Sequence, residues 1–334
     1  MFDFLIDLIR SLVIILALLT GMAYMTWFER RMLGRIQVRI GPNRVGPSGL
    51  LQPLADALKL LFKEDIQPLR ADRLLYPIAP AISLVAALAS FAVIPIGPTL
   101  QVAGRQIELV IQDLPVGLVY LIAASSLGVY GVVLGGWSSG SKYSLLGALR
   151  GGAQVVSYEL VLGLALVGIA LVSGTLSIGE IVARQASSVP FVILQPLGFL
   201  LYLTAAVAET NRAPFDLPEA EQELVAGYHT EYSGFRFGMY FIAEYVNVLT
   251  ASAVAATLFF GGWTGPFNLI GGPWWLLIKM TVFAFIFVWL RGTLPRLRYD
   301  QLMRLSWGVL LPLALLNVLV TAILVVALSG GASS

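Results

Sequence analysis

The sequence predicts an all-α integral membrane protein with about eight transmembrane helices and one interfacial amphipathic helix on the cytoplasmic side. Three observations predict this fold class. Only 12% of the 334 residues are charged and 58% are hydrophobic, whereas about a quarter of a soluble domain is charged. Eight apolar stretches each approach the roughly 20 residues that a helix needs to cross a bilayer. The basic residues are concentrated in alternate loops between those stretches.

The eight predicted spans form a single membrane domain over residues 1–334, because no internal repeat or low-complexity linker divides the chain. Their approximate bounds are 11–28, 76–96, 114–135, 154–172, 189–208, 238–260, 273–290 and 306–328. The first span is predicted to be retained. Asp3 and Asp7 precede it where a signal peptide is basic, and charged residues follow it without a small-residue cleavage site.

The orientation in the membrane is predicted from the loops. Seventeen of the 21 Lys and Arg residues follow the first, third, fifth and seventh spans, and three lie in the other loops and the termini. Since cytoplasmic loops carry the excess of basic residues, these four loops are predicted to be cytoplasmic and both termini to lie on the opposite side. Three of the loops, 29–75, 209–237 and 291–305, also contain 12 of the 19 acidic residues. The cytoplasmic face is therefore predicted to be a docking surface or a site.

The first charged loop contains the predicted amphipathic helix, which begins near Gln52. Its apolar face carries Leu54, Leu58, Leu61 and Phe62, and its charged face carries Asp56, Lys59 and Lys63. About 14 residues are too few to span a bilayer, so the helix is expected to lie in the headgroup region. It either anchors the loop or forms the wall of a cavity that an apolar ligand reaches from within the bilayer.

The second charged loop is predicted to be ordered, because roughly 30 residues are long for a simple connection. Its acidic cluster consists of Asp216, Glu219, Glu221 and Glu223. The cluster is either a solvated acidic surface, a funnel for cations or protons, or a surface that meets basic residues of the first loop or of a partner.

Three further acids lie at membrane depth: Glu159 and Glu244 within spans, and Glu209 at the end of one. A carboxylate inside a membrane is expensive to bury and indicates a functional site. A proton relay is predicted, to which Tyr158, Tyr240 and Tyr245 could contribute hydrogen bonds. In the alternative interpretation each Glu pairs with Lys279 or with a helix dipole.

The remaining charged segments allow weaker interpretations. The basic residues Arg291, Arg296 and Arg298 either follow from topology alone or hold an acidic partner surface or a polar headgroup. His229 is expected to be a loop residue whose ring nitrogens are hydrogen-bonded. A role as a ligand or a base stays open, because histidine titrates near neutral pH. Residues 140–151 are expected to form a small turn-like loop.

The composition excludes several chemistries. The chain has no Cys and a single His, which excludes disulfides, thiolate nucleophiles, iron–sulfur ligation and zinc clusters. No metal site, phosphate-binding loop, dinucleotide fingerprint or catalytic triad is recognised. The basic first loop follows from topology and predicts no nucleic-acid partner. The residues alone therefore fit a transporter, a channel or a coupling subunit whose redox cofactors lie in other chains.

Three segments carry a resemblance to a known family. Residues 29–65, 208–234 and 296–307, which read ERRMLGRIQVRIGPNRVGPSGLLQPLADALKLLFKED, AETNRAPFDLPEAEQELVAGYHTEYSG and RLRYDQLMRLSW, together resemble the H subunit of proton-pumping NADH:quinone oxidoreductase, respiratory complex I. The mitochondrial member of this family is subunit 1. The resemblance implies a bacterial inner-membrane subunit that forms the quinone entry passage between the first span, the sixth span and the amphipathic helix. It also implies that the chain couples quinone reduction to proton translocation.

The same resemblance implies the substrate and the partners. Quinone is the expected substrate, with ubiquinone and menaquinone both open, and this chain alone is expected to bind no cofactor. FMN and the iron–sulfur clusters are expected in partner subunits. The expected partners are the iron–sulfur subunit that carries the terminal cluster, the quinone-headgroup subunit, small membrane subunits and membrane lipid.

Site residues are assigned under this resemblance. The predicted quinone passage comprises Glu29, Arg30, Arg31, Arg39, Asp56, Lys59, Phe215, Arg291, Arg296 and Arg298. The predicted acidic coupling loop comprises Asp216, Glu219, Glu221 and Glu223, and the predicted proton path comprises Glu159, Glu209, Glu244, Tyr158 and Tyr240. One departure is Ser126, at a position where family members carry a Glu, so the relay is expected to have one acid fewer or to use water.

Two alternatives stay open at this stage. The first is the membrane anchor of an energy-converting hydrogenase, which resembles the same subunit. The second is a stand-alone proton or cation transporter.

Overall fold

The computed structural model describes residues 2–102, 105–218, 221–265 and 271–330. Its helices are α1 (Phe2–Ile36), α2 (Gln52–Phe62), α3 (Leu75–Phe91), α4 (Gly117–Ser138), α5 (Lys142–Ser173), α6 (Ile178–Ser187), α7 (Phe191–Leu194), α8 (Pro196–Glu209), α9 (Glu221–Leu224), α10 (Gly234–Phe260), α11 (Pro273–Thr293), α12 (Tyr299–Leu305) and α13 (Leu311–Gly330). Short turns of other helix types occur at Pro47–Gly49, Gly227–His229 and Ser306–Leu310. Strands β1 (Leu100–Val102) and β2 (Arg105–Ile107) form an antiparallel hairpin. The prediction of an all-α membrane protein is confirmed.

Six helices of the described part are long and apolar enough to cross a membrane. They are α1, α4, α5, α10, α11 and the continuous run from α12 through α13. The two other predicted spans correspond to the shorter apolar helices α3 and α8. All eight apolar stretches are therefore helical, but two of them are shorter than the roughly 20 residues of a simple crossing.

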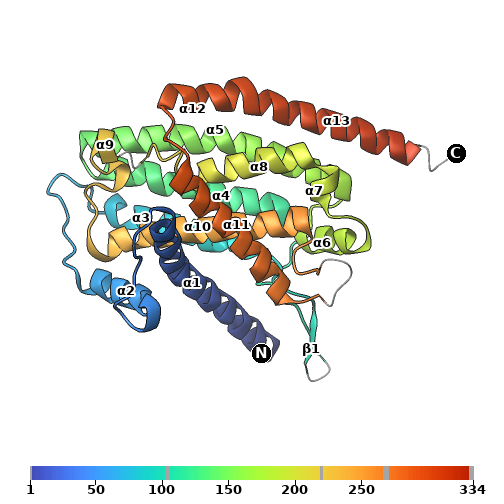
Figure 1. The fold of residues 1–334 in the computed structure, drawn as a ribbon, viewed down its shortest axis with the longest axis horizontal. Helices are drawn as coiled ribbons and strands as arrows, with labels where there is room; N and C mark the ends of the chain where they lie inside the picture. The colour runs from blue at the N-terminus through green and yellow to red at the C-terminus, as the bar shows by residue number, and fades with distance from the viewer. Residues whose placement is uncertain (1, 103–104, 219–220, 266–270, 331–334) are drawn as a thin grey trace.

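α10 lies at the centre of the bundle. It packs against α1, α3 and α11, while α5 packs against α4, α8 and α13. Figure 1 shows α5, α8 and α10 running in similar directions, with α1 and α11 crossing them obliquely. Glycines allow close approach where helices meet, as in many membrane proteins. A Cβ at Gly131 of α4, for example, would lie 2.9 Å from the Ala79 carbonyl oxygen of α3.

The predicted amphipathic helix is α2, which has 11 residues and packs against α1 and α10. None of its residues is buried, and Leu54, Leu58 and Leu61 remain exposed. An apolar face that the protein itself does not cover is what a helix in the membrane interface requires.

Two predicted segments take a different form in the structure. The segment 140–151, expected to be a loop, belongs mostly to α5, which begins at Lys142. The predicted span 189–208 is interrupted at Gln195, because Pro196 disfavours helical backbone at the residue before it. The Gln195 side chain accepts a hydrogen bond from the Asn317 amide at 2.9 Å and donates to Thr321 at 2.6 Å, so the interruption is tied to α13.

Candidate functional site

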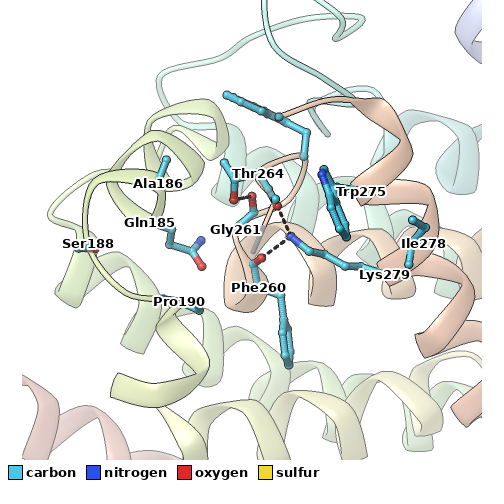
Figure 2. Close-up of a pocket in the computed structure, with 13 residues that line it drawn as sticks. Gln185, Ala186, Ser188, Pro190, Phe260, Gly261, Thr264, Trp275, Ile278 and Lys279 are labelled. Atoms are coloured by element: carbon cyan, nitrogen blue, oxygen red, sulfur yellow. Dashed lines mark hydrogen bonds between the residues drawn. The ribbon is translucent and has the colours of Figure 1, made fainter. Parts of the chain in front are cut away.

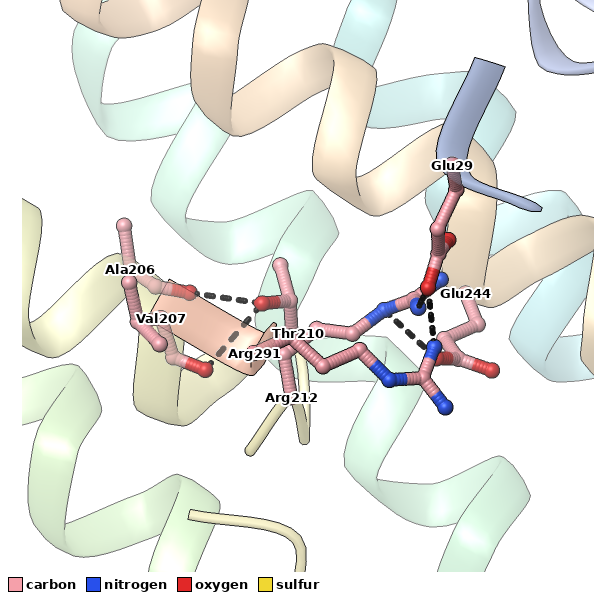
Figure 3. Close-up of polar contacts among 7 residues, drawn as sticks. All are labelled: Glu29, Ala206, Val207, Thr210, Arg212, Glu244 and Arg291. Atoms are coloured by element: carbon pink, nitrogen blue, oxygen red, sulfur yellow. Dashed lines mark hydrogen bonds and ion pairs between the residues drawn. The ribbon is translucent and has the colours of Figure 1, made fainter. Parts of the chain in front are cut away.

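Four charged side chains form an ion-pair cluster at the end of the bundle where α1 ends and α10 begins. They are Glu29 of α1, Arg212 after α8, Glu244 of α10 and Arg291 of α11. Glu29 and Arg212 are buried, whereas the Arg291 side chain is 40% exposed, and the group is named the buried ion-pair cluster here after its centre. Arg212 Nη1 donates to both oxygens of Glu29, at 2.7 and 2.9 Å, and its Nε lies 2.8 Å from Glu244 Oε1. Arg291 also pairs with Glu29 (Figure 3). Two carboxylates and two guanidinium groups thus compensate one another, as buried charges require.

The backbone conformation around Arg212 directs its side chain into the cluster. Thr210 ends α8, and its hydroxyl donates to the Ala206 and Val207 carbonyls at 3.0 and 3.1 Å (Figure 3). Asn211 then adopts a positive φ of 51°, which turns the chain away from the helix axis. From α5, the Gln154 amide donates to the Ala208 and Phe215 carbonyls at 2.8 and 2.7 Å and fixes both sides of the turn.

Arg212 is the centre of the cluster. Its side chain is 5% exposed, and its guanidinium lies over the Tyr245 ring, 4.4 Å from the ring centroid. Burial alone would lower the pKa of Arg212, but the carboxylates of Glu244 and Glu29 more than offset this effect and raise the pKa. Arg212 is therefore a permanent cation that holds two carboxylates of different helices together.

A cavity of about 320 Å³ adjoins this cluster and is named the polar cavity here. It is lined by Glu29, Arg30, Leu33, Arg212, Tyr228, His229, Phe237, Tyr240, Phe241, Glu244, Tyr245 and Arg291. Burial lowers the pKa of His229 to about 4, so this imidazole is neutral at pH 7. The fixed charges around the cavity therefore come from Arg and Glu side chains.

An apolar groove of about 430 Å³ runs along the membrane-spanning parts of α1 and α11. Its walls include Ile14, Leu18, Gly21, Met25 and Phe28 of α1 and Leu277, Met280, Thr281 and Ala284 of α11. Leu249 of α10 also lines the groove. At one end, Phe28 is followed directly by Glu29 of the polar cavity. Apolar and polar surfaces therefore follow one another along a single helix.

A line of acids leads from the polar cavity into the bundle. Glu244 also lines a cavity of about 60 Å³, named the first inner cavity, which contains Glu209. Glu209 in turn lines a second inner cavity of about 40 Å³. Glu159 of α5 is the next acid: it interacts electrostatically with Glu209 and accepts a hydrogen bond from Ser126. The structure thus brings together the three carboxylates predicted to form a path.

Lys279 does not neutralise these acids. Its Nζ donates to the carbonyl oxygens of Phe260, Gly262 and Thr264 at 2.6, 2.8 and 2.7 Å, at and just after the C-terminal end of α10. Figure 2 shows this lysine at the edge of a cavity of about 590 Å³ formed with α6 and α11. A cation at a helix C-terminus is favourable. The alternative in which Lys279 pairs with Glu159 or Glu244 is therefore wrong, since these acids contact Ser126 and Arg212.

The sequence is similar to known proteins along nearly its whole length. Residues 9–322 match the family model described as NADH dehydrogenase. A Thermomicrobium roseum protein, named as the H subunit of NADH-quinone oxidoreductase, is 58% identical over 320 residues, 93% of either chain. Proteins of the same name from Syntrophotalea carbinolica and Protochlamydia amoebophila are 56% and 54% identical, over 91% of this chain in both cases and over 91% and 92% of theirs.

The chain belongs to the NADH dehydrogenase family, among the H subunits of NADH-quinone oxidoreductase. The resemblance stated from three segments is therefore confirmed over nearly the whole chain. Membership in this family assigns the chain to the membrane part of complex I.

Several residues predicted for the passage of this complex I subunit lie around the polar cavity. Arg30 lines it and pairs with Asp56 of α2 at 2.5 Å, so the amphipathic helix is tied to α1. Glu29 and Arg291 line the cavity as well. The remaining predicted basic residues lie outside the cavity. Lys59 is on α2, Arg31 lies against Trp27 and the Ser48 carbonyl, Arg39 lies beside Gln37, Arg296 pairs with Asp216 at 2.6 Å, and Arg298 pairs with Asp300 at 2.9 Å. Phe215 contacts Tyr158 within the core.

The acidic loop is partly described in this family member. Asp216 pairs with Arg296, and Glu223 pairs with Arg150 of α5 at 2.8 Å. Glu219 lies outside the described residues, and Glu221 begins the short helix α9. The charges of this loop are therefore distributed among partners on several elements.

The two tyrosines assigned to the proton path have different surroundings. Tyr240 lines both the polar cavity and the first inner cavity, and its hydroxyl donates to the Gly131 carbonyl at 2.9 Å. Tyr158 is fully buried, and its hydroxyl donates to the Leu302 carbonyl at 3.1 Å. Tyr158 lines neither inner cavity.

Sequence reasoning did not single out Arg212, although it is the central cation of the site. Nothing in its spacing indicates that it faces Glu29, which is 183 positions away. The available signal was its place beside Glu209 in a charged loop that begins at membrane depth. Asn247, which lines both inner cavities, was missed for a similar reason, because a single Asn in a span carries little pattern.

Proposed function

We propose that this complex I subunit forms the quinone entry passage and couples quinone reduction to proton translocation. The observation that carries the proposal is Glu244, which lines both the polar cavity and the first inner cavity. One carboxylate thus belongs to the buried ion-pair cluster and to the line of acids. A change of charge in the polar cavity can therefore act on acids inside the bundle.

The passage follows the amphipathic character of quinone. The isoprenoid tail occupies the apolar groove between α1 and α11, and the headgroup passes by way of the polar cavity toward the partner that holds the headgroup site. The groove is apolar where α1 spans the membrane and gives way to charge at Glu29. This route uses α1 and α10, as expected from the sequence. The sequence predicted α2 as the third wall of the passage, whereas α11 is the third wall of the apolar groove. α2 is instead tied to α1 through the ion pair between Arg30 and Asp56.

Coupling depends on the balance of the buried ion-pair cluster. Reduction of quinone by a partner's iron–sulfur cluster takes up protons and changes the charge near Glu29 and Arg212. Because Arg212 contacts both carboxylates, any weakening of its bond to Glu29 alters its hold on Glu244. Glu209 and Glu159 then change protonation, and the signal passes to neighbouring antiporter-like subunits. FMN and all clusters belong to partner subunits in this proposal.

The proposed location is the bacterial inner membrane, with the charged end of the bundle on the cytoplasmic side and both termini on the other side. The loops that hold 17 of 21 basic residues support this orientation. The iron–sulfur subunit and the quinone-headgroup subunit would then dock on the face that contains α2, α9 and α12.

A Gly21→Phe variant tests the passage. Gly21 is on the wall of the apolar groove, where a Cβ meets only Leu249 at 3.6 Å, so a phenyl ring would enter the groove. For the purified complex we expect the KM for long-tailed quinones to rise about tenfold or more, with a smaller rise for short-tailed analogues. Gly163→Phe is the matched control, since nothing lies within 4 Å of a Cβ there. Equal KM values for the two variants would show that the tail does not use this groove.

Reconstitution of the purified chain in liposomes separates the alternatives. A coupling subunit is expected to give no ion flux when the isolated chain is placed in liposomes. When purified under conditions that preserve complexes, it is expected to be accompanied by iron–sulfur subunits that accept electrons from NADH. Flux from the chain alone would establish a stand-alone transporter. Purification with a nickel-containing partner in place of NADH-binding subunits would establish a hydrogenase anchor.

A further inference from the structure

One face of α10 presents polar side chains to both inner cavities. Glu244, Asn247 and Thr250 follow one another at intervals of three residues, so they lie on one side of the helix. Glu244 lines the first inner cavity, Thr250 lines the second, and Asn247 lines both. Ser83 of α3 completes the first inner cavity from the opposite side. Outside the acids themselves, the proposed path thus has its own set of neutral polar groups.

Two of these groups have no partner within the described protein. Ser83 Oγ and Thr250 Oγ1 are buried, and no described residue hydrogen-bonds either atom. Asn247 lines both cavities, and its amide can both donate and accept hydrogen bonds. Buried hydroxyl groups without partners are costly, and in native proteins such groups generally bind ordered water.

The size of the cavities is compatible with water. A water molecule needs a cavity of about 10–15 Å³, and the inner cavities measure about 60 and 40 Å³. Both are lined by Glu209, so water in either cavity can hydrogen-bond its carboxylate. Ser125 and Thr210 also line both cavities, but their hydroxyls already donate to helix carbonyls. Asn247 is therefore the side chain best able to bind water on both sides.

We propose that Asn247 is a positioning residue that holds ordered water between Glu244 and Glu209, with Ser83 and Thr250 binding water at the two ends. This inference rests on the proposed function, because it identifies what joins two acids of the proton path. Asn247 itself does not titrate. It orients water so that a proton leaving one carboxylate finds an unbroken series of hydrogen bonds to the next.

The test uses the complete complex in proteoliposomes. Asn247→Leu keeps the branched shape of the side chain but removes the amide, and we expect quinone-coupled proton pumping to fall at least about tenfold. Asn247→Ser keeps a polar group and leaves room for another water, so it should restore most of the pumping. NADH oxidation with an artificial electron acceptor should be unchanged in both variants, because it reports the electron-transfer subunits, and co-purification of this chain with those subunits checks that the complex is assembled.

Thr250→Val gives an independent comparison with Thr257→Val. Both threonines are buried on α10, but Thr257 Oγ1 donates to the Ala253 carbonyl at 2.7 Å and lines neither inner cavity. Only Thr250→Val should reduce pumping and change its solvent deuterium isotope effect. A structure of the complex that resolves water should show density beside Asn247 in the wild type and lose it in Asn247→Leu.

The outcomes separate this inference from the function on which it rests. Normal pumping in Asn247→Leu, with pumping lost in Glu209→Gln, would overturn the role of Asn247 alone. Normal pumping in Glu209→Gln would overturn the proton path itself. Equal losses in Asn247→Leu and Asn247→Ser would indicate a packing role and would also overturn the inference.

Discussion

Replacement of Arg212 by Leu is expected to abolish quinone reductase activity and to destabilise the charged end of the bundle. The substitution leaves Glu29 and Glu244 facing each other across a buried site in which Arg212 contacts both. Removing one member of a buried ion pair costs about 3–5 kcal/mol, because the remaining charge is uncompensated. Arg291 still pairs with Glu29 in this variant, so Glu29 keeps one compensating cation whereas Glu244 loses its pair with Arg212.

The measurement is the thermal stability of the purified complex together with its quinone reductase activity. Arg298→Leu is the control, since its pair with Asp300 is exposed, at 74% and 67% of the two side chains, and exposed pairs contribute about 0–1 kcal/mol. Arg212→Lys should restore part of the stability but little activity, because one ammonium nitrogen cannot reproduce the contacts that Nη1 makes with Glu29 and Nε makes with Glu244. An Arg212→Leu complex with wild-type melting temperature and activity would contradict the central role of this cation.

A second substitution distinguishes charge from packing. Addition of Glu244→Gln to Arg212→Leu removes the carboxylate that Arg212→Leu leaves unpaired. The double variant should regain much of the lost stability while quinone-coupled pumping stays low, since Glu244 joins the two parts of the proposed path. Recovery of both properties would assign the cluster to structure alone.

The fold class could be predicted from sequence because it depends on the overall composition and on the spacing of apolar and charged residues along the chain. The low charge, the eight apolar stretches and the basic loops each depend on whether a segment lies in lipid or in water, and not on which other residues it contacts. Amphipathic helix α2 was also predictable, because its apolar face repeats at the helical interval within 11 residues. The break at Gln195 could have been anticipated from Pro196 alone.

The geometry of the site could not be predicted in the same way. Glu29, Arg212 and Arg291 come from three separate elements, and their pairing depends on how α1 and α11 cross α10. The acids Glu159, Glu209 and Glu244 were recognisable because a carboxylate at membrane depth is conspicuous by itself. Their neutral neighbours Asn247 and Thr250 were not, because they become meaningful only once the cavities between them are known.

Replacement of Glu209 by Gln is expected to abolish quinone-coupled proton pumping. Glu209 lines both inner cavities and interacts electrostatically with Glu159, so it stands between Glu244 and the last acid of the line. Gln has nearly the same shape and hydrogen-bonding reach but cannot release a proton. Positioned proton-transfer groups contribute about 10²–10⁴-fold to rates, and a loss of at least about 100-fold in pumping is therefore expected.

The experiment compares proton uptake per quinone reduced in proteoliposomes that contain the whole complex. Glu180→Gln is the matched control: Glu180 is exposed on α6, accepts a hydrogen bond from Thr175 at 2.6 Å and lines none of the cavities on the path. NADH oxidation with an artificial acceptor should persist in both variants, because the electron-transfer centres belong to other subunits in the proposed function. Full pumping with normal quinone turnover in Glu209→Gln would disprove the coupling path. Loss of pumping in Glu180→Gln as well would show that the effect does not depend on the inner cavities.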